Sequence, residues 1–402
     1  MTLTLQDIEN AATRIATATV NTRFEKSQTL SSMAGTELYL KFENFQFTAS
    51  FKDRGALNKL LLLKEQGATA GVIAMSAGNH AKAVAYHAQR LNIPATIVMP
   101  RNTPNVKVQD TKNFDARVIL FGDTLDESAN HANEVAAAES LVFVHPYNDM
   151  DIMAGQGTVA LEMLAVEPNL DCIVVPVGGG GLIAGVATAA KAINPNIKII
   201  GVEVDAYPSV QNALHGNVKT EGGTTIAEGI AVKQPGDLTL EVIRRLVDEM
   251  LVVSEDSIEE AINLFLSIEK TVTEGAGAAA LAAVLSNTRV FQNHKTALIL
   301  SGANIDSRIL ASLLMRRLVK KGRIVRFLVE IDDSPGTLSE VAEAIGEFGG
   351  NILDVSHQRM FASVPVKKAD LYLTVETRDA EQNQAILARL RALNYNAKLL
   401  ED

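Results

Sequence analysis

Short runs of apolar, mostly β-branched residues alternate with longer stretches of helical period between about residue 36 and residue 320. A strand that is buried on both faces is apolar at successive positions, so these runs predict parallel sheets covered by helices on both sides. The expected strands are residues 37–43, 72–75, 95–99, 117–120, 142–144, 172–177, 199–204, 251–253 and 296–300. Substrates of such sheets bind at the carboxyl ends of the strands, so we expect functional residues in the loops that follow.

The C-terminal part of the chain, from residue 322, has a different pattern. Residues 324–331, 351–359, 371–376 and 397–400 are expected strands, and residues 335–348 and 380–393 are expected helices. The order β-α-β-β-α-β is that of the ferredoxin-like α+β fold. We therefore expect a small separate domain after the α/β body.

Composition and charge exclude several classes of protein. The 402 residues contain no apolar run of the roughly 18 residues that a membrane span needs, and the start has no signal-peptide pattern. The single cysteine, Cys172, excludes an internal disulfide and a zinc site of paired cysteines, and we expect no metal. The formal charge of −10 argues against nucleic acid or an anionic membrane as partner. These features predict a cytoplasmic enzyme.

A run of four glycines is the strongest local signal for a binding site. Gly178, Gly179, Gly180 and Gly181 follow an expected strand and precede, with Leu182, an expected helix over 183–193. Glycines let backbone N–H groups approach an anion at a helix start, which predicts a phosphate site rather than a flexible turn. The spacing fits neither a dinucleotide fingerprint nor a nucleotide P-loop.

Lys52 lies in the first turn of an expected helix, directly after Phe51. We expect Thr48 or Ser50 to cap this helix. A cation is unfavourable at a helix start, so the pKa of this lysine is expected to fall, and a neutral amine is what reacts with an aldehyde. Taken alone, the position of Lys52 favours a solvated surface lysine, as most helical lysines are, and Phe51 is compatible with a core residue.

Two further strand ends carry polar residues. Ser76, Gly78, Asn79 and His80 follow the expected strand 72–75, and such a set of donors suits a carboxylate. The alternative is that Ser76 or Asn79 is an ordinary helix cap. Ser301 follows the expected strand 296–300, although Ser-Gly is also a common turn pair.

Together the four motifs resemble one family. S-F-K-D-R-G-A at 50–56, S-A-G-N-H at 76–80, G-G-G-G-L at 178–182 and S-G-A-N at 301–304 resemble the fold-type II pyridoxal phosphate enzymes. Among these, the chain is similar to threonine ammonia-lyases (threonine dehydratases) with one C-terminal ACT domain. The resemblance implies a catalytic domain over 1–321, with parallel or mixed sheets flanked by helices and a small subdomain inserted at about 45–145. An α+β ACT domain would occupy 322–402, and the chain would form a homodimer or homotetramer.

The resemblance also implies roles for the residues of the motifs. Lys52 would bind pyridoxal 5′-phosphate covalently and later remove the α-proton of the substrate. Phe51 would lie against the cofactor ring, Asn79 would bond its 3′-oxygen, and Ser301 would face its pyridine nitrogen. The residues expected to hold the phosphate are Gly178, Gly179, Gly180, Gly181 and Leu182. Those expected to receive the substrate carboxylate are Ser76, Gly78, Asn79 and His80.

Two other segments match the family more loosely. Residues 225–231 resemble a loop beside the cofactor, with Gly229 closest to it. Residues 273–277 resemble a turn at the border of the site, but Glu274 is equally compatible with a favourable charge at a helix start. Some relatives bind a cation through an acidic residue that corresponds to Glu203. Tyr207 and Ser209 stand where further ligands would be needed, so we expect no cation there.

The reaction implied is β-elimination of L-threonine to 2-oxobutanoate and ammonia, and of L-serine to pyruvate. A neutral Ser301 makes the cofactor a weaker electron sink than a carboxylate would, which favours loss of the β-hydroxyl over transamination. A serine racemase is the alternative enzyme, but it needs a second acid where Ala77 stands, and alanine has no proton to donate. A non-catalytic amino-acid sensor would not need Lys52 or the glycine run.

The C-terminal domain resembles ACT domains at the turn D-D-S-P-G-T-L over 332–338. Such domains commonly pair and bind an amino acid, here isoleucine or valine, and the alternative is a domain used only for oligomerisation. The residues expected to bind the effector are Gly336, Thr337, Leu338, Asn351 and Ile352. The sequence as a whole is compatible with a biosynthetic role in isoleucine formation and with a catabolic role.

Overall fold

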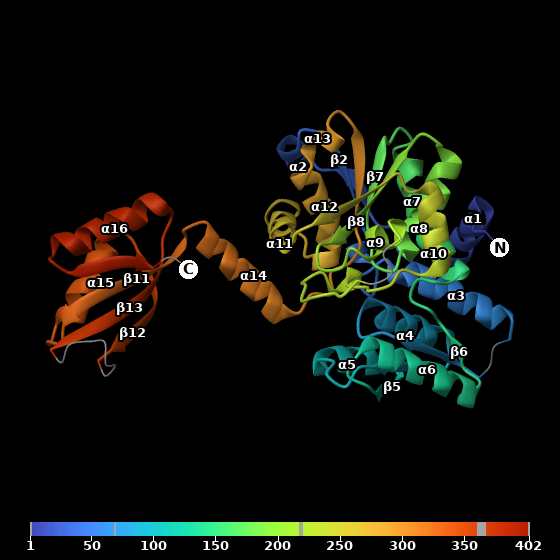
Figure 1. The fold of residues 1–402 in the computed structure, drawn as a ribbon, viewed down its shortest axis with the longest axis horizontal. Coiled ribbons are helices and arrows are strands. Elements are labelled where there is room, and N and C mark those ends of the chain that lie inside the picture. The colour runs from blue at the N-terminus through green and yellow to red at the C-terminus, as the bar shows by residue number, and fades with distance from the viewer. Residues whose placement is uncertain (1, 68–69, 217–219, 360–366, 401–402) are drawn as a thin grey trace. The chain divides into compact units, whose positions relative to one another are not determined.

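The chain folds into two compact units that divide between Ile305 and Asp306 (Figure 1). The structure, a computed structural model, describes residues 2–67, 70–216, 220–359 and 367–400. Within these residues, no helix is long and apolar enough to cross a membrane. Each unit has its own sheets and its own apolar core.

A six-stranded sheet with strand order β1-β2-β10-β7-β8-β9 is the centre of the first unit. Strand β1 is antiparallel to β2, and every other neighbouring pair is parallel. The strands are β1 (Phe24–Lys26), β2 (Glu37–Phe42), β7 (Cys172–Pro176), β8 (Lys198–Val204), β9 (Glu249–Val253) and β10 (Lys295–Leu300). β7, β8 and β10 are buried along nearly their whole length, which explains their unbroken apolar sequence.

Helices cover both faces of this sheet. α12 packs on one face, and α7, α8 and α10 lie on the other (Figure 1). α8 and α12 are buried around most of their circumference because they are rich in small apolar residues. The helices are α1 (Leu5–Ile15), α2 (Gln28–Ala34), α7 (Met150–Val166), α8 (Gly181–Ile193), α9 (Ser209–Leu214), α10 (Asp237–Leu246), α11 (Glu255–Leu264), α12 (Gly275–Ser286) and α13 (Thr288–Phe291), with short turns at Glu43–Phe45, Glu228–Ile230 and Phe265–Glu269.

A smaller parallel sheet, with strand order β5-β4-β3-β6, lies within the same unit. α3 and α4 pack on one face of it and α6 on the other. The elements are β3 (Val72–Met75), β4 (Ala95–Met99), β5 (Arg117–Leu120), β6 (Val142–Phe143), α3 (Lys52–Glu65), α4 (Asn79–Leu91), α5 (Asn105–Lys112) and α6 (Leu125–Glu139). Since α3 also packs against α7, it joins the small sheet to the large one.

The second unit is an antiparallel sheet of order β12-β13-β11-β14, with α15 and α16 packed on one face. Its elements are α14 (Ser307–Lys320), β11 (Ile324–Asp332), α15 (Thr337–Glu347), β12 (Asn351–Gln358), β13 (Lys368–Glu376), α16 (Ala380–Ala392) and β14 (Asn396–Leu400). From β11 on, this is the expected β-α-β-β-α-β order. The α/β body and the α+β ferredoxin-like domain are thus confirmed.

Two features of the fold differ from the expectation. The sequence gives no signal for β1, because three residues that pair along only one strand need no extended apolar pattern. Helix α14 contacts β11 and falls within the second compact unit, which therefore begins at Asp306, ahead of the ACT domain expected over 322–402.

A buried cluster of charges fixes α3 to the large sheet. The guanidinium of Arg54 donates to Glu43 through Nε and Nη2, each at 2.8 Å, and to Glu162 through Nη1 at 2.7 Å. Lys41 pairs with Glu162 as well. Arg54, Glu43 and Lys41 are fully buried. Burying such charges is tolerable only when each one is paired and hydrogen-bonded.

We expect Glu43→Gln to destabilise the first unit by about 3–5 kcal/mol, because it leaves the buried charge of Arg54 only partly compensated. Glu25→Gln is the matched control, since its ion pair with Arg23 is about half exposed and should be worth less than about 1 kcal/mol. The chain contains no tryptophan, so unfolding in urea is best followed by circular dichroism. Equal losses in the two variants would contradict the role assigned to the cluster.

Candidate active site

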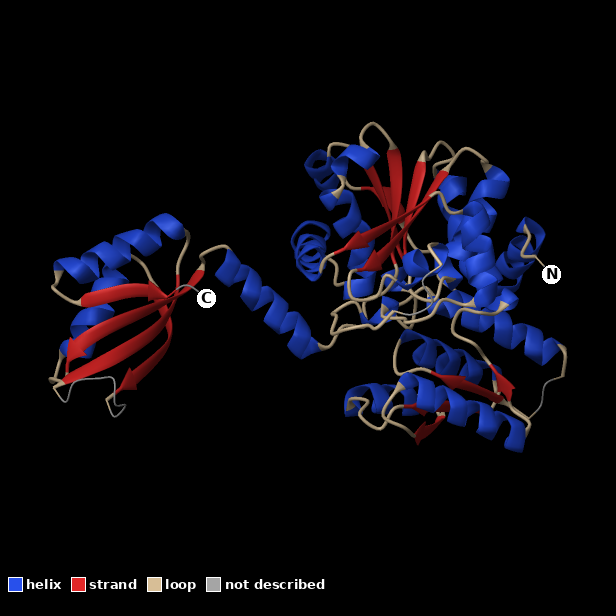
Figure 2. Cartoon of the chain, in the orientation of Figure 1, coloured by secondary structure: helices blue, strands red, loops and turns tan. Residues whose placement is uncertain are grey.

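The loops that follow the strands of the large sheet gather between this sheet and the smaller one (Figure 2). Three helices, two that follow strands of the large sheet and one that follows a strand of the smaller sheet, carry predicted site residues at or before their first turns. α3 begins at Lys52, α4 begins at Asn79, and α8 begins at Gly181. The first N–H groups of a helix have no partner within it, so each start offers donors to a bound anion.

Lys52 is partly buried and points toward the segment that follows β6. Its Nζ donates to the carbonyl oxygen of Pro146 at 2.7 Å and lies 5.1 Å from the centre of the Phe51 ring. Burial lowers the pKa of Lys52 to about 8, although the charge of Glu274 acts in the opposite direction. The amine is therefore neutral in a larger fraction of molecules than an exposed lysine near pH 7, as nucleophilic attack requires.

The turn before Lys52 is built differently from the expectation. Neither Thr48 nor Ser50 caps α3, so that expectation was wrong: the N-cap residue is Phe51, which makes no side-chain cap bond. Thr48 instead donates its backbone N–H and its hydroxyl to Asp53, at 2.9 and 2.5 Å. The hydroxyl of Ser50 is buried without a partner among the described residues.

At the start of α4, the N-cap residue is Gly78, so the alternative that Ser76 or Asn79 caps this helix was also wrong. The hydroxyl of Ser76 accepts the N–H of Gly78 at 3.1 Å. The Asn79 side chain forms hydrogen bonds with distant residues instead. Its amide nitrogen donates to the Glu274 carboxylate at 2.7 Å, and its amide oxygen accepts from the Asn304 amide at 2.7 Å. These bonds fix the orientation of the Asn79 amide toward the centre of the site.

The imidazole of His80 does not present a charge to the site. Its Nε2 donates to the carbonyl oxygen of Val144 at 2.9 Å, and its Nδ1 is buried without a partner in the described structure. Burial lowers the pKa of His80 to about 3. The ring therefore stays neutral, and what His80 offers a carboxylate is its backbone N–H in the first turn of α4.

The glycine run lies against Tyr147, which no motif had indicated. A side-chain carbon on Gly179 would meet the Tyr147 ring at 2.3 Å, and one on Gly181 would meet its Cβ at 2.9 Å. Gly180 has φ +93°, a conformation that favours glycine. The glycines thus leave room for the Tyr147 side chain as well as for a ligand. Larger residues at these positions would therefore lower the stability of the fold in addition to weakening ligand binding.

The orientation of the glycine loop is also fixed. The carbonyl oxygen of Gly179 accepts from the N–H of Gly236 at 3.2 Å and from the hydroxyl of Thr239 at 2.7 Å. In a trans peptide the C=O and the N–H point in opposite directions. The N–H of Gly180 therefore points away from Thr239 and α10. It can serve a bound anion together with the first N–H groups of α8.

Ser301, at the end of β10, is buried next to the Lys52 turn. Its carbonyl oxygen accepts the N–H of Phe51 at 3.0 Å, and Gly302 forms a bridge with Ser50. Glu274 Oε1 lies 2.6 Å from where a Cβ of Gly302 would be, and 3.1 Å from that of Gly229. The structure thus brings Ser301, Gly229 and Glu274 to the same place as Lys52 and Asn79.

Several site residues were not predicted or were left open. Burial raises the pKa of Glu274 to about 7, so this carboxyl exchanges a proton near neutral pH. His145 accepts two backbone N–H groups at Nδ1, and burial lowers its pKa to about 4. His145, Pro146 and Tyr147 follow strand β6, so the rule that sites lie at strand ends pointed to them.

Glu203, where the sequence predicts no cation, lies outside the group of residues around Lys52. Glu203 accepts the N–H groups of Val210 and Gln211 at 2.7 and 2.9 Å and thus holds the start of α9. Among the described residues, no group of three or more His, Cys, Asp or Glu side chains is placed to hold a metal ion.

The effector residues lie in the second unit, in two separate groups. Gly336, Thr337 and Leu338 begin α15, after the end of β11. Asn351 and Ile352 begin β12, level with the start of β11, since Asn351 and Ile324 both pair with Glu376. One unit by itself therefore does not bring the two groups together.

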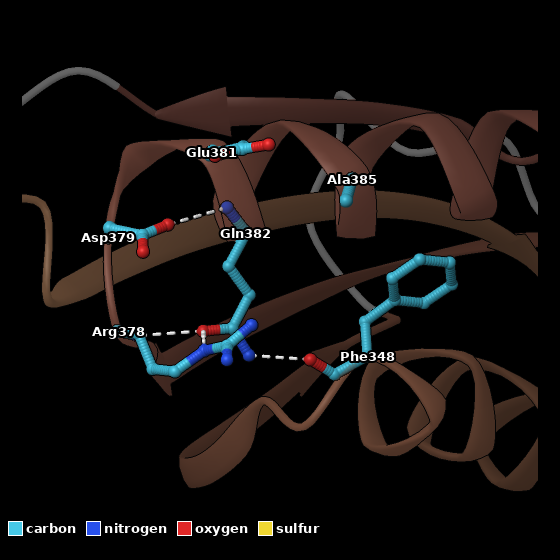
Figure 3. A pocket seen from close by; sticks show the side chains of 6 residues that line it. All are labelled: Phe348, Arg378, Asp379, Glu381, Gln382 and Ala385. Atoms are coloured by element: carbon cyan, nitrogen blue, oxygen red, sulfur yellow. Dashed lines mark hydrogen bonds between the residues drawn. The ribbon is translucent and has the colours of Figure 1, made fainter.

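Each group has a cleft near it. One cleft, of about 370 Å³, is lined by Glu330, Asp332, Ser334, Thr337, Glu340, Lys368, Leu393, Asn394, Tyr395 and Asn396. The other, of about 340 Å³, is lined by Phe348, Arg378, Asp379, Glu381, Gln382 and Ala385 (Figure 3). In this second cleft the Gln382 amide accepts from Arg378 and donates to the carbonyl oxygen of Phe348.

The residues of the first unit fit pyridoxal phosphate. A lysine amine whose pKa is about 8 suits the aldehyde, and the N–H groups at the start of α8 suit the phosphate. The Asn79 amide has a second hydrogen beyond the one that it gives to Glu274. These groups suit the aldehyde, the phosphate and a ring oxygen of the cofactor, and Ser301, which is expected to face the ring nitrogen, offers a neutral hydroxyl.

The comparisons with known proteins agree with this fit. The family "Pyridoxal-phosphate dependent enzyme" matches residues 15–302, and the family "ACT domain" matches residues 324–394. The L-threonine ammonia-lyase of Thermotoga maritima is 43% identical over 400 residues, which cover 99% of this chain and 100% of that protein.

Two solved structures are similar to the first unit. The processed form of threonine deaminase isoform 2 from Solanum lycopersicum has TM-score 0.73 and 36% identity, covering 77% of this chain and 87% of that one. Maize serine racemase has the same TM-score, 0.73, and 36% identity, covering 80% of this chain and 99% of that one. The chain therefore belongs to the fold-type II pyridoxal-phosphate dependent enzymes and carries a C-terminal ACT domain.

Proposed function

We propose that this enzyme eliminates water from L-threonine; the enamine that is released rearranges to an imine, which takes up water to give 2-oxobutanoate and ammonia. L-Serine would react in the same way to give pyruvate and ammonia. The observation that carries the proposal is the convergence of Lys52, Asn79, the glycine loop and Ser301 between the two sheets. The similarity to proteins named L-threonine ammonia-lyase and threonine deaminase supports threonine as the substrate.

Pyridoxal phosphate, when bound, withdraws electrons from the substrate α-carbon so that its proton can leave. Lys52 would hold the cofactor and then, as a free amine, remove that proton. The substrate carboxylate would bind at the start of α4, where the helix dipole and the N–H groups of Asn79 and His80 favour a negative charge. This places the carboxylate beside Ser76 and Gly78.

Glu274 is suited to a proton transfer in this site. It is buried beside Asn79, and its carboxyl, with a pKa of about 7, carries a proton in part of the molecules at neutral pH. Ser301 would meet the ring nitrogen with a neutral hydroxyl. Neither Glu274 nor Ser301 places a permanent negative charge near the ring. Loss of the β-hydroxyl can therefore compete well with transamination.

Racemisation of serine is the second candidate, because maize serine racemase shares this fold. A racemase needs a proton donor on the face of the substrate opposite the lysine. The residue between Ser76 and Gly78 is Ala77, whose methyl group packs against the core of the smaller sheet. Formation of D-serine from L-serine at a rate comparable to pyruvate formation would favour the racemase.

The proposal extends to the organisation of the chain. Residues 1–321 would be the catalytic part, with the smaller subdomain at about 45–145, and residues 322–402 the regulatory ACT domain. Two copies would pair through ACT domains in a homodimer or homotetramer in the cytoplasm. The effector, isoleucine or valine, would bind at the cleft beside Thr337, where carboxylates and Lys368 offer partners for both charges of an amino acid.

Lys52→Ala should abolish turnover and the visible absorbance of the bound cofactor, because no other amine takes its place. The thermal midpoint of the cofactor-free protein should stay within a few degrees, since the Lys52 side chain makes a single hydrogen bond among the residues that the structure describes. Lys59→Ala, about two turns further along the same helix, is the control that should keep its turnover. Near wild-type turnover in Lys52→Ala would refute the mechanism.

The attachment of pyridoxal phosphate to the cofactor-free enzyme should depend on pH through Lys52. Below pH about 8 the amine is increasingly protonated, so the rate should fall with decreasing pH and level off above that value. Stopped-flow absorbance measures this rate. A small-molecule lysine analogue, whose rate keeps rising toward its pKa of roughly 10.4, is the control. The same continued rise in the enzyme would show that burial does not lower this pKa.

A chain that ends at Lys321 should remain active and lose its response to isoleucine or valine. The predicted catalytic residues all precede Asp306, where the structural units divide. In the full-length enzyme, the effector should shift the threonine saturation curve by a factor of about 5–150, which corresponds to ordinary coupling energies. A truncated enzyme that keeps this response would place the effector site in the first unit.

Point variants locate the effector site within the second unit. Thr337→Val should weaken the effector response, and Arg378→Ala, in the cleft of Figure 3, is the matched control that should keep it. The reverse result would move the site to the second cleft.

A further inference from the structure

The turn that leads into Lys52 is held in an unfavourable conformation. Ala49 has φ +59°, in the left-handed region that residues with a side chain adopt only when their surroundings impose it. Its N–H donates to the carbonyl oxygen of Gln46, and its carbonyl oxygen accepts from Ala303, each at 2.9 Å. Without such restraints the turn would relax and Lys52 would change direction.

Asp53, the residue after Lys52, provides the remaining restraint. One carboxylate oxygen accepts the hydroxyl of Thr48 at 2.5 Å, and the other accepts the Thr48 N–H at 2.9 Å. The side chain thus reaches back across Ala49 and Lys52 and closes the turn. Asp53 is 1% exposed and Thr48 5%, so water does not compete for these bonds.

The same carboxylate also contacts α4. Nε2 of His87 lies 3.4 Å from Asp53 Oδ1, and the His87 side chain is 1% exposed. Neither ring nitrogen of His87 has a hydrogen-bond partner in the described structure, so His87 approaches the carboxylate without a hydrogen bond. A buried carboxylate with three polar neighbours therefore lies between the helix that starts with Lys52 and the helix that starts with Asn79.

A further link continues from Thr48 into the site. The carbonyl oxygen of Thr48 accepts from the Asn304 amide at 2.8 Å. The same Asn304 amide donates to the side-chain oxygen of Asn79 at 2.7 Å. A continuous line of hydrogen bonds thus runs from Asp53 through Thr48 and Asn304 to Asn79.

We propose that Asp53 is a positioning residue. Its two hydrogen bonds with Thr48, which we call the clasp, hold the strained turn at Ala49 and thereby set the direction of Lys52 and of the Asn79 amide. The inference rests on the proposed function only in taking Lys52 as the point where the cofactor attaches. A purely structural role would stabilise the fold without affecting the reactivity of Lys52. The two roles differ in what they predict for cofactor attachment.

Asp53→Asn is the principal test, because an amide accepts at one oxygen and presents N–H groups where the carboxylate accepted. Pyridoxal phosphate should attach to this cofactor-free variant about tenfold more slowly, in line with the cost of misplacing a reacting group. Its kcat for threonine should fall while its KM stays within about twofold. Thr48→Val, which removes only the hydroxyl, should act in the same direction, and Thr48→Ser should restore attachment to near the wild-type rate.

The control is Asn58→Ala, on the same helix. Asn58 is also 1% exposed and donates to the carbonyl oxygen of Asp151, so its loss weakens the anchoring of α3 away from the turn. This variant should lose thermal stability and attach the cofactor at the wild-type rate. The Asp53→Asn, Thr48→Val double variant should be no slower than Asp53→Asn alone, since both changes break the same clasp.

Wild-type attachment rates in Asp53→Asn and Thr48→Val would overturn the proposal, as would losses that multiply in the double variant. If Asp53→Asn does not fold, the pair Thr48→Val and Thr48→Ser decides by the same measurement. Failure of the proposed function would look different, because the wild-type enzyme itself would then attach no cofactor or not deaminate threonine.

Discussion

The pairing of Arg54 with Glu43 and Glu162 is the constraint on which the catalytic unit depends. A fully buried guanidinium must be compensated on several sides, and here its partners come from the short turn directly after β2 and from α7. Because Arg54 lies two residues after Lys52, any movement of α3 would break this pairing. The lysine is therefore anchored by a charge cluster that has no direct part in the chemistry.

The same structural feature recurs in the site: a helix that begins after a parallel strand. α4 follows β3 and α8 follows β7, so two sets of unpaired N–H groups face the space between the sheets. Anions bind well at such positions, which suits a substrate carboxylate and a phosphate. Lys52 starts a third helix, α3, where a positive charge is unfavourable, and this agrees with a readily deprotonated amine.

Burial determines the charges in the site. It lowers the pKa of Lys52, His80 and His145 and raises that of Glu274, so that all four groups tend toward their neutral forms. His80 and His145 each donate or accept within the protein and act as fixed dipoles. Because burial reduces the charge that these groups carry, the charges of the cofactor and substrate would be the strongest electrostatic features of the site, and helix starts and amides would set their orientation.

The sequence by itself determined the two kinds of sheet, nearly all strand positions and the four motifs, because buried parallel strands and glycine-rich strand ends leave strong local patterns. It did not determine the packing of Tyr147 against the glycine run, the contact between Asn79 and Glu274, or the clasp of Thr48 by Asp53. Capping was misjudged at both α3 and α4 for the same reason. The local rule expects a hydroxyl or amide before a helix to accept from its first N–H groups. Here Thr48 bonds Asp53 and Ser76 bonds Gly78, whereas Asn79 bonds the distant Glu274 and Asn304. Only the tertiary structure decides such contacts, since the first two join residues that lie far apart in the chain. The third, between Thr48 and Asp53, is local but depends on a turn that Ala303 helps to hold.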